Sequence, residues 1–143
     1  MNNSGATQIV GTWKLVSYVV EVQENGHIIK VMGDAPTGYT TFLPSGRVFF
    51  MLTAEGRIPH HTPEGHALLL DTMVAYTGTY RIEEDKWITR VEVAWNPEWI
   101  GTEQTRFFKL EGSCLQVLTP WRLMPNWADH GMTRSIISFE RAE

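Results

Sequence analysis

The sequence predicts an all-β protein, an antiparallel up-and-down barrel of about eight to ten strands with one short helix that acts as a lid. Three observations favour this class. Apolar and polar residues alternate with a period of two along most of the chain. Turn sequences, such as the Asn-Gly pair at residues 25–26 and the Pro-Ser-Gly stretch at residues 44–46, separate the alternating segments. Only one segment, residues 54–73, has helical character.

The length favours a single domain, because a chain of 143 residues buries roughly two thirds of its unfolded surface without disulfides or metals. We expect this domain at residues 8–143 and a disordered tail at residues 1–7, which are small and polar. The single cysteine, Cys114, has no intramolecular partner, and the N-terminus lacks a signal-peptide pattern. Both features favour a reducing, cytoplasmic location.

Charge and hydropathy narrow the expected partners. The net charge is -4 and the Lys and Arg residues are scattered, which argues against binding to nucleic acid or to an anionic membrane. No apolar stretch reaches the length that spans a membrane. The expected partner is therefore a neutral or mildly charged small molecule.

The first half of the chain predicts four strands in a meander. Both faces of the first strand, residues 12–23, are largely apolar, so we expect this strand to be covered on both sides for part of its length. The Asn-Gly turn then returns the chain along residues 27–32. A second hairpin is expected from residues 38–43 and 47–53.

The helical segment is interpreted as a lid or plug over the barrel. Its Thr62-Pro63-Glu64 sequence resembles a helix start with proline in the first turn. The segment also carries His60, His61 and His66, whose spacing matches no common metal motif, so no metal site is predicted. We expect these histidines in solvent; the alternative is that one acts as an acid or base when the lid closes.

The second half predicts five more strands, at residues 72–82, 89–95, 102–110, 114–119 and 132–141. Gly78 marks a position where a strand bends or where another group approaches the backbone closely. The loop at residues 120–130 is unusually apolar, and a homodimer in which exposed Trp121 and Trp127 form the contact is a further alternative, compatible with either a binding or an enzymatic function.

Polar groups stand among apolar ones on the two strands that flank the turn at residues 96–101. If these strands are antiparallel neighbours, Glu92 and Arg106 meet inside the barrel. Three outcomes are open: the groups satisfy one another and only fix strand register, they face solvent, or they belong to a ligand site in which Arg106 or Gln104 binds a carboxylate, carbonyl or phenolate. In the third case Glu92 is a candidate general base.

Aromatic residues at a period of two usually belong to a core, but Tyr76 and Tyr80 flank Gly78 on a face expected to point inward. Their hydroxyls need partners, and a ligand would supply them. The candidate catalytic residues are Glu92, Tyr76 and Tyr80. The predicted ligand-binding residues are Arg90, Glu92, Gln104, Arg106, Tyr76, Tyr80, Phe49, Trp95 and Phe108.

Five stretches together resemble the lipocalin-like domain family of bacteria and fungi, over residues 9–141. The first contains Gly11-Thr12-Trp13, which matches the Gly-x-Trp signature of lipocalins. The resemblance implies a closed barrel of about eight strands with room for one small ligand, and it implies that Trp13 packs at the closed end. The stretches are GTWKLVSY, GYTTFLPSGRVFF, AYTGTYRI, ITRVEVAWNPEWIGTEQTRFF and ISFER.

Two functions fit this sequence. The first is a module that binds a small apolar or aromatic molecule in a cavity inside the barrel. The alternative is a cofactor-free isomerase or cyclase of secondary metabolism, which acts on a polyketide- or terpenoid-like intermediate in the same cavity. No phosphate loop, nucleophile elbow or dinucleotide fingerprint occurs, so no cofactor is predicted.

Overall fold

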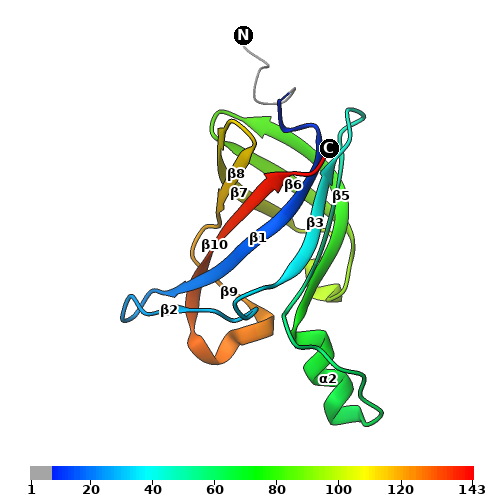
Figure 1. Cartoon of the computed structure of the whole chain (residues 1–143), viewed down its shortest axis with the longest axis vertical. Helices are drawn as coiled ribbons and strands as arrows, with labels where there is room; N and C mark the ends of the chain where they lie inside the picture. The colour runs from blue at the N-terminus through cyan, green and yellow to red at the C-terminus, as the bar shows by residue number, and fades with distance from the viewer. Residues whose placement is uncertain (1–7) are drawn as a thin grey trace.

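The computed structural model describes residues 8–143, and its strands form one antiparallel sheet of ten strands. Pairing between β1 and β10 closes eight of them into a barrel, and the two-residue strands β2 and β9 extend it (Figure 1). The predicted all-β barrel with one short α-helix is therefore confirmed, whereas the predicted tail at residues 1–7 lies outside the described residues. The strands are β1 (Gly11–Val22), β2 (Ile28–Ile29), β3 (Thr37–Phe42), β4 (Arg47–Thr53), β5 (Met73–Glu83), β6 (Lys86–Ala94), β7 (Glu103–Glu111), β8 (Cys114–Leu118), β9 (Arg122–Leu123) and β10 (Met132–Arg141), and the helices are α2 (Pro63–Asp71), η1 (Pro97–Trp99) and η2 (Pro125–His130).

The first four segments differ from the predicted meander. Of the strand expected at residues 27–32, only β2 forms, and it pairs with the end of β1 at Val20 and Glu21. The start of β1 pairs instead with β3. A strand of twelve residues is long enough for both partners on one edge, so the chain passes from β2 to β3 without pairing the two.

A bulge at Val16 explains why both faces of β1 are apolar. Register with β10 passes from Leu15 opposite Phe139 to Ser17 opposite Ser138, which leaves Val16 unpaired. Before the bulge Leu15 is buried, and after it Tyr18 is buried, although the two residues stand on opposite faces of a regular strand. The expectation that β1 is covered on both sides is therefore wrong.

A second bulge lies between β5 and β6, beside Gly78. Thr77 pairs with Val93 but Gly78 pairs with Val91, so Glu92 has no partner in the ladder. A Cβ atom on Gly78 would lie 1.9 Å from the carbonyl oxygen of Arg90. The predicted close approach at Gly78 is thus confirmed, and the approaching group is the neighbouring strand.

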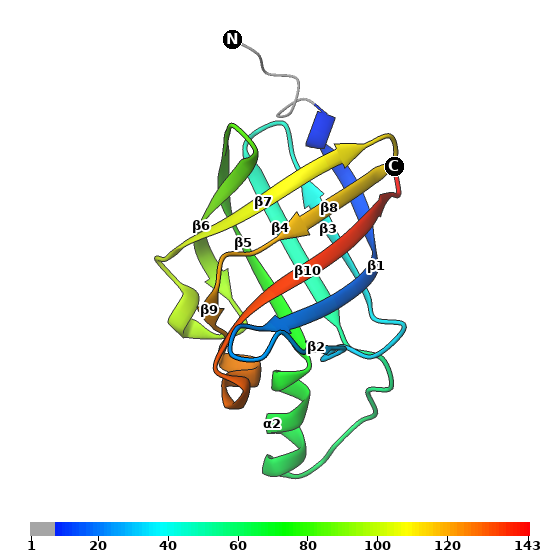
Figure 2. The same cartoon turned by 90° about the vertical axis from the view of Figure 1, so that its left-hand side faces the viewer.

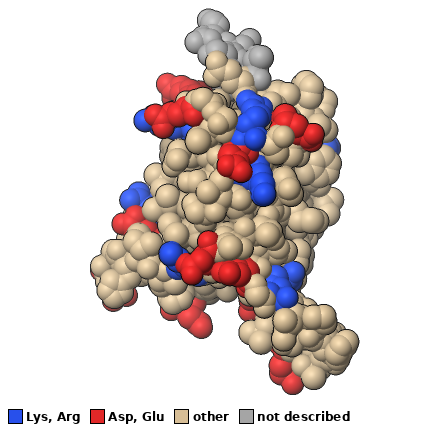
Figure 3. Space-filling model, viewed as in Figure 1, with Lys and Arg blue, Asp and Glu red and all other residues tan. Residues whose placement is uncertain are grey.

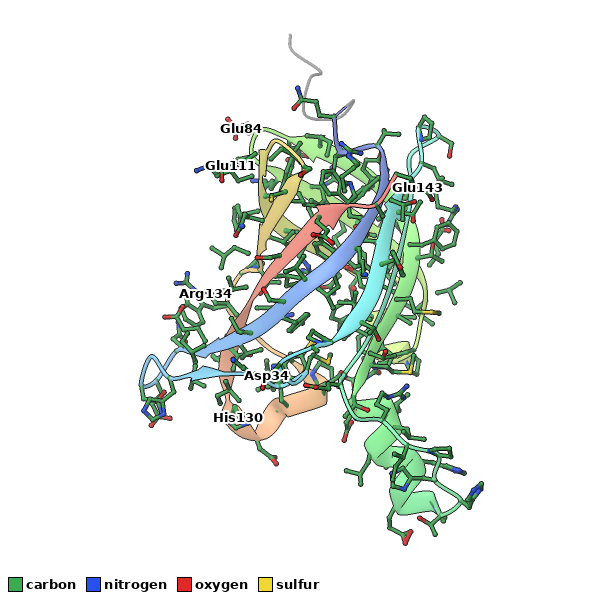
Figure 4. The ribbon with its side chains drawn as sticks, in the orientation of Figure 1. Asp34, Glu84, Glu111, His130, Arg134 and Glu143 are labelled. Atoms are coloured by element: carbon green, nitrogen blue, oxygen red, sulfur yellow. The ribbon has the colours of Figure 1, made fainter. Side chains whose placement is uncertain are left out.

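Trp13 and Arg141 close one end of the barrel. The indole of Trp13 is fully buried and donates a hydrogen bond to the carbonyl of Ile9 at 2.9 Å. The guanidinium of Arg141 lies 4.0 Å from the centre of the Trp13 ring and donates to the carbonyl of Val10 at 2.6 Å. The expected position of Trp13 is confirmed. Three labelled acidic residues mark this end in Figure 4: Glu84, Glu111 and Glu143.

Aromatic side chains fill the barrel next to this closed end. The ring of Phe42 packs edge-on against Trp87 at 5.0 Å and against Tyr80 at 5.1 Å. Phe50 stacks on Trp87 at 6.1 Å and contacts Phe139 at 6.2 Å. This half of the interior is a packed core.

The helix α2 lies at the opposite end and extends beyond the barrel (Figures 1 and 2). Thr62 caps it by accepting a hydrogen bond from the Gly65 amide at 3.0 Å, as the predicted helix start requires. Gly65 is its only buried residue, and Leu68 is 59% exposed. The helix therefore does not plug the barrel, and a lid function stays a prediction.

Candidate functional site

The inward face of β7 brings polar side chains to the open end of the barrel. Gln104, Arg106 and Phe108 point inward, as their alternation predicted. The Arg106 side chain is only 4% exposed, although it carries a positive charge. The ring of Trp99, from η1, lies 5.7 Å from its guanidinium carbon.

A second arginine, Arg122 of β9, reaches the same place, and sequence reasoning missed it. Its Nε atom is buried and has no partner in the described structure, and its Nη1 donates to Ser135 Oγ at 3.3 Å. The Ser135 hydroxyl is also within 2.9 Å of the Tyr18 hydroxyl. A strand of two residues has no periodicity, so the only available signal was one arginine within an apolar loop.

Both arginines line a cleft of about 390 Å³ at the open end, between η1, β7 and the β9–η2 segment. Trp99 and Met124 form apolar parts of its wall. The same two arginines also line an interior cavity of about 10 Å³ with Tyr76, a volume that holds about one water molecule. They therefore lie between the open cleft and the packed interior.

Within residues 8–143 no carboxylate forms a salt bridge with either arginine. The first seven residues contain no Asp or Glu. Burial lowers the pKa of the Arg122 guanidinium, and repulsion from Arg106 acts in the same direction. Burial raises the pKa of the Tyr76 phenol, which Arg106 partly opposes, so Tyr76 is neutral at pH 7 and supplies no negative charge.

A comparison with protein families agrees with this architecture. A family model described as a lipocalin-like domain matches residues 10–142. The chain belongs to the lipocalin-like domain family. No curated protein matches the chain. The lipocalin-like barrel supports ligand binding in general terms, and the identity of the ligand has to be argued from the site.

The predicted pair between Glu92 and Arg106 is wrong in this lipocalin-like domain. The bulge opposite Gly78 leaves Glu92 on the outer face, where its carboxylate lies 2.9 Å from the Arg47 guanidinium. Arg90 is also exposed on the outer face of β6, opposite Glu103. Neither residue reaches the cleft.

Three predicted aromatic residues lie away from the arginines. Phe49 is 45% exposed on the outer face of β4. Phe108 packs against Trp87 at 5.5 Å, in the core near the closed end. Trp95 is half-buried and its ring lies 4.9 Å from that of Trp99, so it stands behind the cleft wall.

The two candidate catalytic tyrosines are separated. Tyr80 points inward as predicted, but its hydroxyl donates to the carbonyl of Leu43 at 3.0 Å. Tyr76 lines the small interior cavity with both arginines, and its ring contacts Trp99 at 5.1 Å. Of the predicted residues, Gln104, Arg106 and Tyr76 therefore come together, and Arg122 joins them.

The remaining expectations concern metals and the tryptophans of the last loop. Within the described residues, no group of three or more His, Cys, Asp or Glu side chains is placed to hold a metal ion. Trp127 is 8% exposed and packs against Tyr18, while Trp121 lies under the Arg134 guanidinium at 4.5 Å. The expected surface of two exposed tryptophans is wrong, and a homodimer stays a prediction without a defined contact.

The surface charge of the domain does not indicate a particular class of binding partner. In residues 8–143 no helix is long and apolar enough to cross a membrane. On the face shown in Figure 3, acidic and basic groups lie together in small mixed clusters, and wide uncharged areas lie between these clusters. The cleft at the open end is therefore the feature from which a function is argued.

Proposed function

We propose that this lipocalin-like domain binds a small molecule with an apolar or aromatic body in the cleft at the open end of its barrel. The observation that carries the proposal is the cleft itself, whose volume of about 390 Å³ lies in the range typical of small-molecule sites. Its wall combines apolar surface, including Trp99 and Met124, with polar side chains that can orient a ligand, including Gln104.

The aromatic wall argues for a planar ligand. Trp99 contacts Trp95 edge-on at 4.9 Å and Tyr76 at 5.1 Å, so its ring is held from two sides. A rigid indole offers a large contact area at little entropic cost. The interior beyond Arg106 has only about 10 Å³ of free space, so the ligand body occupies the mouth of the barrel instead of its centre.

No specific observation favours the isomerase or cyclase alternative. Its proposed base, Glu92, lies on the outer face and pairs with Arg47. The phenol of Tyr76 has a pKa raised by burial, which makes it a poor base at neutral pH. Binding without turnover is therefore the function proposed, while the cytoplasmic location and a role in secondary metabolism stay predictions.

Native mass spectrometry of the protein from its own source tests for a retained ligand. Titration with the neutral fluorophore N-phenylnaphthylamine then tests the cleft. We expect saturable binding with energy transfer from tryptophan, reduced in Trp99→Phe, which keeps an aromatic ring but removes the nearest donor. The matched control is Trp121→Phe, whose ring packs against the Arg134 guanidinium at 4.5 Å and does not line the cleft. Absence of saturable binding would contradict the proposal.

A further inference from the structure

We propose that the ligand is an organic acid whose ionised group is held jointly by Arg106 and Arg122. This inference rests on the proposed function and specifies the chemistry of its ligand. It starts from the two arginines at the base of the cleft: Arg106 is buried, Arg122 is partly buried with a fully buried Nε, and neither forms a salt bridge with a carboxylate of the described residues.

Few groups of the protein accept hydrogen bonds from the two guanidinium groups. Each guanidinium has five N–H donors and needs acceptors when it is removed from water. Arg106 donates to the carbonyl of Thr105 at 2.8 Å, and Arg122 donates to the Ser135 hydroxyl at 3.3 Å. Both acceptors are uncharged, and the buried Nε of Arg122 has none among the described residues. An anion would satisfy donors on both side chains.

The nearby carboxylates do not fill this role. Glu98 and Glu103 line the cleft, but both are exposed at its rim. Glu103 accepts two hydrogen bonds from Arg81, at 2.9 and 3.3 Å, on the outer side of the barrel. Neither carboxylate therefore pairs with the two guanidinium groups, which repel one another, and one anion between them would offset that repulsion.

The arginines are held in place before a ligand arrives. Arg106 lies beside the Trp99 ring and is bonded to its own strand through the Thr105 carbonyl. Arg122 is bonded to Ser135, whose hydroxyl also contacts Tyr18. Because these side chains are already ordered, binding an acid costs little conformational entropy. The planar guanidinium fork fits a carboxylate or sulfonate well.

The apolar wall of the cleft favours an organic acid over a small inorganic anion as the ligand. Trp99 and Met124 border the arginines on the cleft side, and both are almost fully buried. An inorganic ion would fill only the part of the cleft beside the arginines and would leave most of its volume of about 390 Å³ to water. An acid with an aromatic or polycyclic body covers the wall and places its charge at the arginines.

A matched pair of fluorophores tests the inference. Anilinonaphthalene sulfonate is N-phenylnaphthylamine with one added sulfonate, so the ratio of their dissociation constants isolates the anion. We expect the sulfonate to bind wild type at least about tenfold more tightly, because each charge-assisted contact is worth about one order of magnitude or more. Arg106→Met and Arg122→Met should each lose this preference, so that the ratio of the two dissociation constants approaches one.

The control variant is Arg90→Met, which removes the same charge from the outer face of the neighbouring strand and should leave both affinities unchanged. Binding of the neutral fluorophore also reports whether each variant keeps a folded cleft. Equal affinity of wild type for both fluorophores, or an unchanged preference in both arginine variants, would overturn the inference and leave the proposed function standing. Failure of both fluorophores to bind wild type would overturn the proposed function as well.

Discussion

Arg122 is a single charged residue whose position destabilises the folded protein, a cost that a bound anion would offset. Its Nε is buried without a partner among the described residues, and its Nη1 donates to an uncharged acceptor, the Ser135 hydroxyl. A buried charge without a partner destabilises the folded state, and a residue of similar shape without the charge avoids that cost. Such a position is typical of a binding site and is difficult to explain as a purely structural contact.

The first prediction at the residue scale follows from this cost. Without ligand, Arg122→Met should raise the free energy of unfolding by about 1 kcal/mol, because desolvation of the charge outweighs one long hydrogen bond. Urea denaturation measures the change. The exposed Arg90→Met variant should change it by less than about 0.5 kcal/mol. Loss of stability in Arg122→Met would show that the arginine has a structural role.

A second residue-scale prediction concerns Tyr76 and alkaline pH. Burial raises the pKa of this phenol in the folded state above its unfolded value of 10.0. The contribution of Tyr76 to the free energy of unfolding is therefore fully present below about pH 10. It is lost as the pH rises further, because only the unfolded chain releases the phenol proton. The fall attributable to Tyr76 approaches about 1.4 kcal/mol per pH unit.

Tyr76→Phe should accordingly lose less stability than wild type between about pH 9 and pH 11, measured by urea denaturation at each pH. Tyr39→Phe is the control, because Tyr39 is 50% exposed on the outer face. An identical alkaline slope in wild type and Tyr76→Phe would contradict a buried phenol at this position.

Bulges decide at the scale of the element which side chains enter the barrel. The bulge at Val16 reverses which face of β1 points inward, so that Tyr18 lines the small interior cavity. The bulge opposite Gly78 places Glu92 on the outer face and brings the Arg90 carbonyl into contact with the glycine. The chemistry at the open end therefore depends on two irregularities in otherwise regular strands.

Gly78→Ala tests the second bulge. The new Cβ would lie 1.9 Å from the Arg90 carbonyl oxygen, so β5 and β6 must separate. We expect the free energy of unfolding to fall by about 3 kcal/mol in urea denaturation. Thr79→Ala, at the next and exposed position of β5, is the matched control. A loss below about 0.5 kcal/mol in Gly78→Ala would mean that the strands are not in close contact there.

At the scale of the whole molecule, the two ends of the barrel have separate roles. Trp13 and Arg141 join the first and last strands at the closed end, next to the C-terminus (Figure 1). Arg106 and Arg122 lie towards the other end, which Asp34 and His130 mark in Figure 4. A packed aromatic core separates the two ends.

Arg141→Met should therefore lower stability without changing the cleft. The variant loses the contact with the Trp13 ring and the hydrogen bond to the Val10 carbonyl, which together are worth about 2 kcal/mol. Urea denaturation measures this loss, and N-phenylnaphthylamine titration should give the wild-type affinity. Lys14→Met, at an exposed position of β1, is the control. A weaker affinity in Arg141→Met would show that the two ends are coupled.

The sequence by itself determined the barrel class and most strand positions. Alternation and turn residues are local properties, so β4 at residues 47–53 and β10 at residues 132–141 were predicted to the residue. The inward face of β7, with Gln104 and Arg106, was also predicted, because this strand has no bulge.

Only the tertiary structure decided the composition of the site. A bulge appears only when a strand is aligned with its partner, so alternation alone placed Glu92 on the wrong face. Arg122 comes from a strand too short to have a period, and it meets Arg106 only because the barrel closes. The fold depends on local patterns that can be read along the chain. The arginine pair depends on contacts between residues distant in sequence, which no local pattern records.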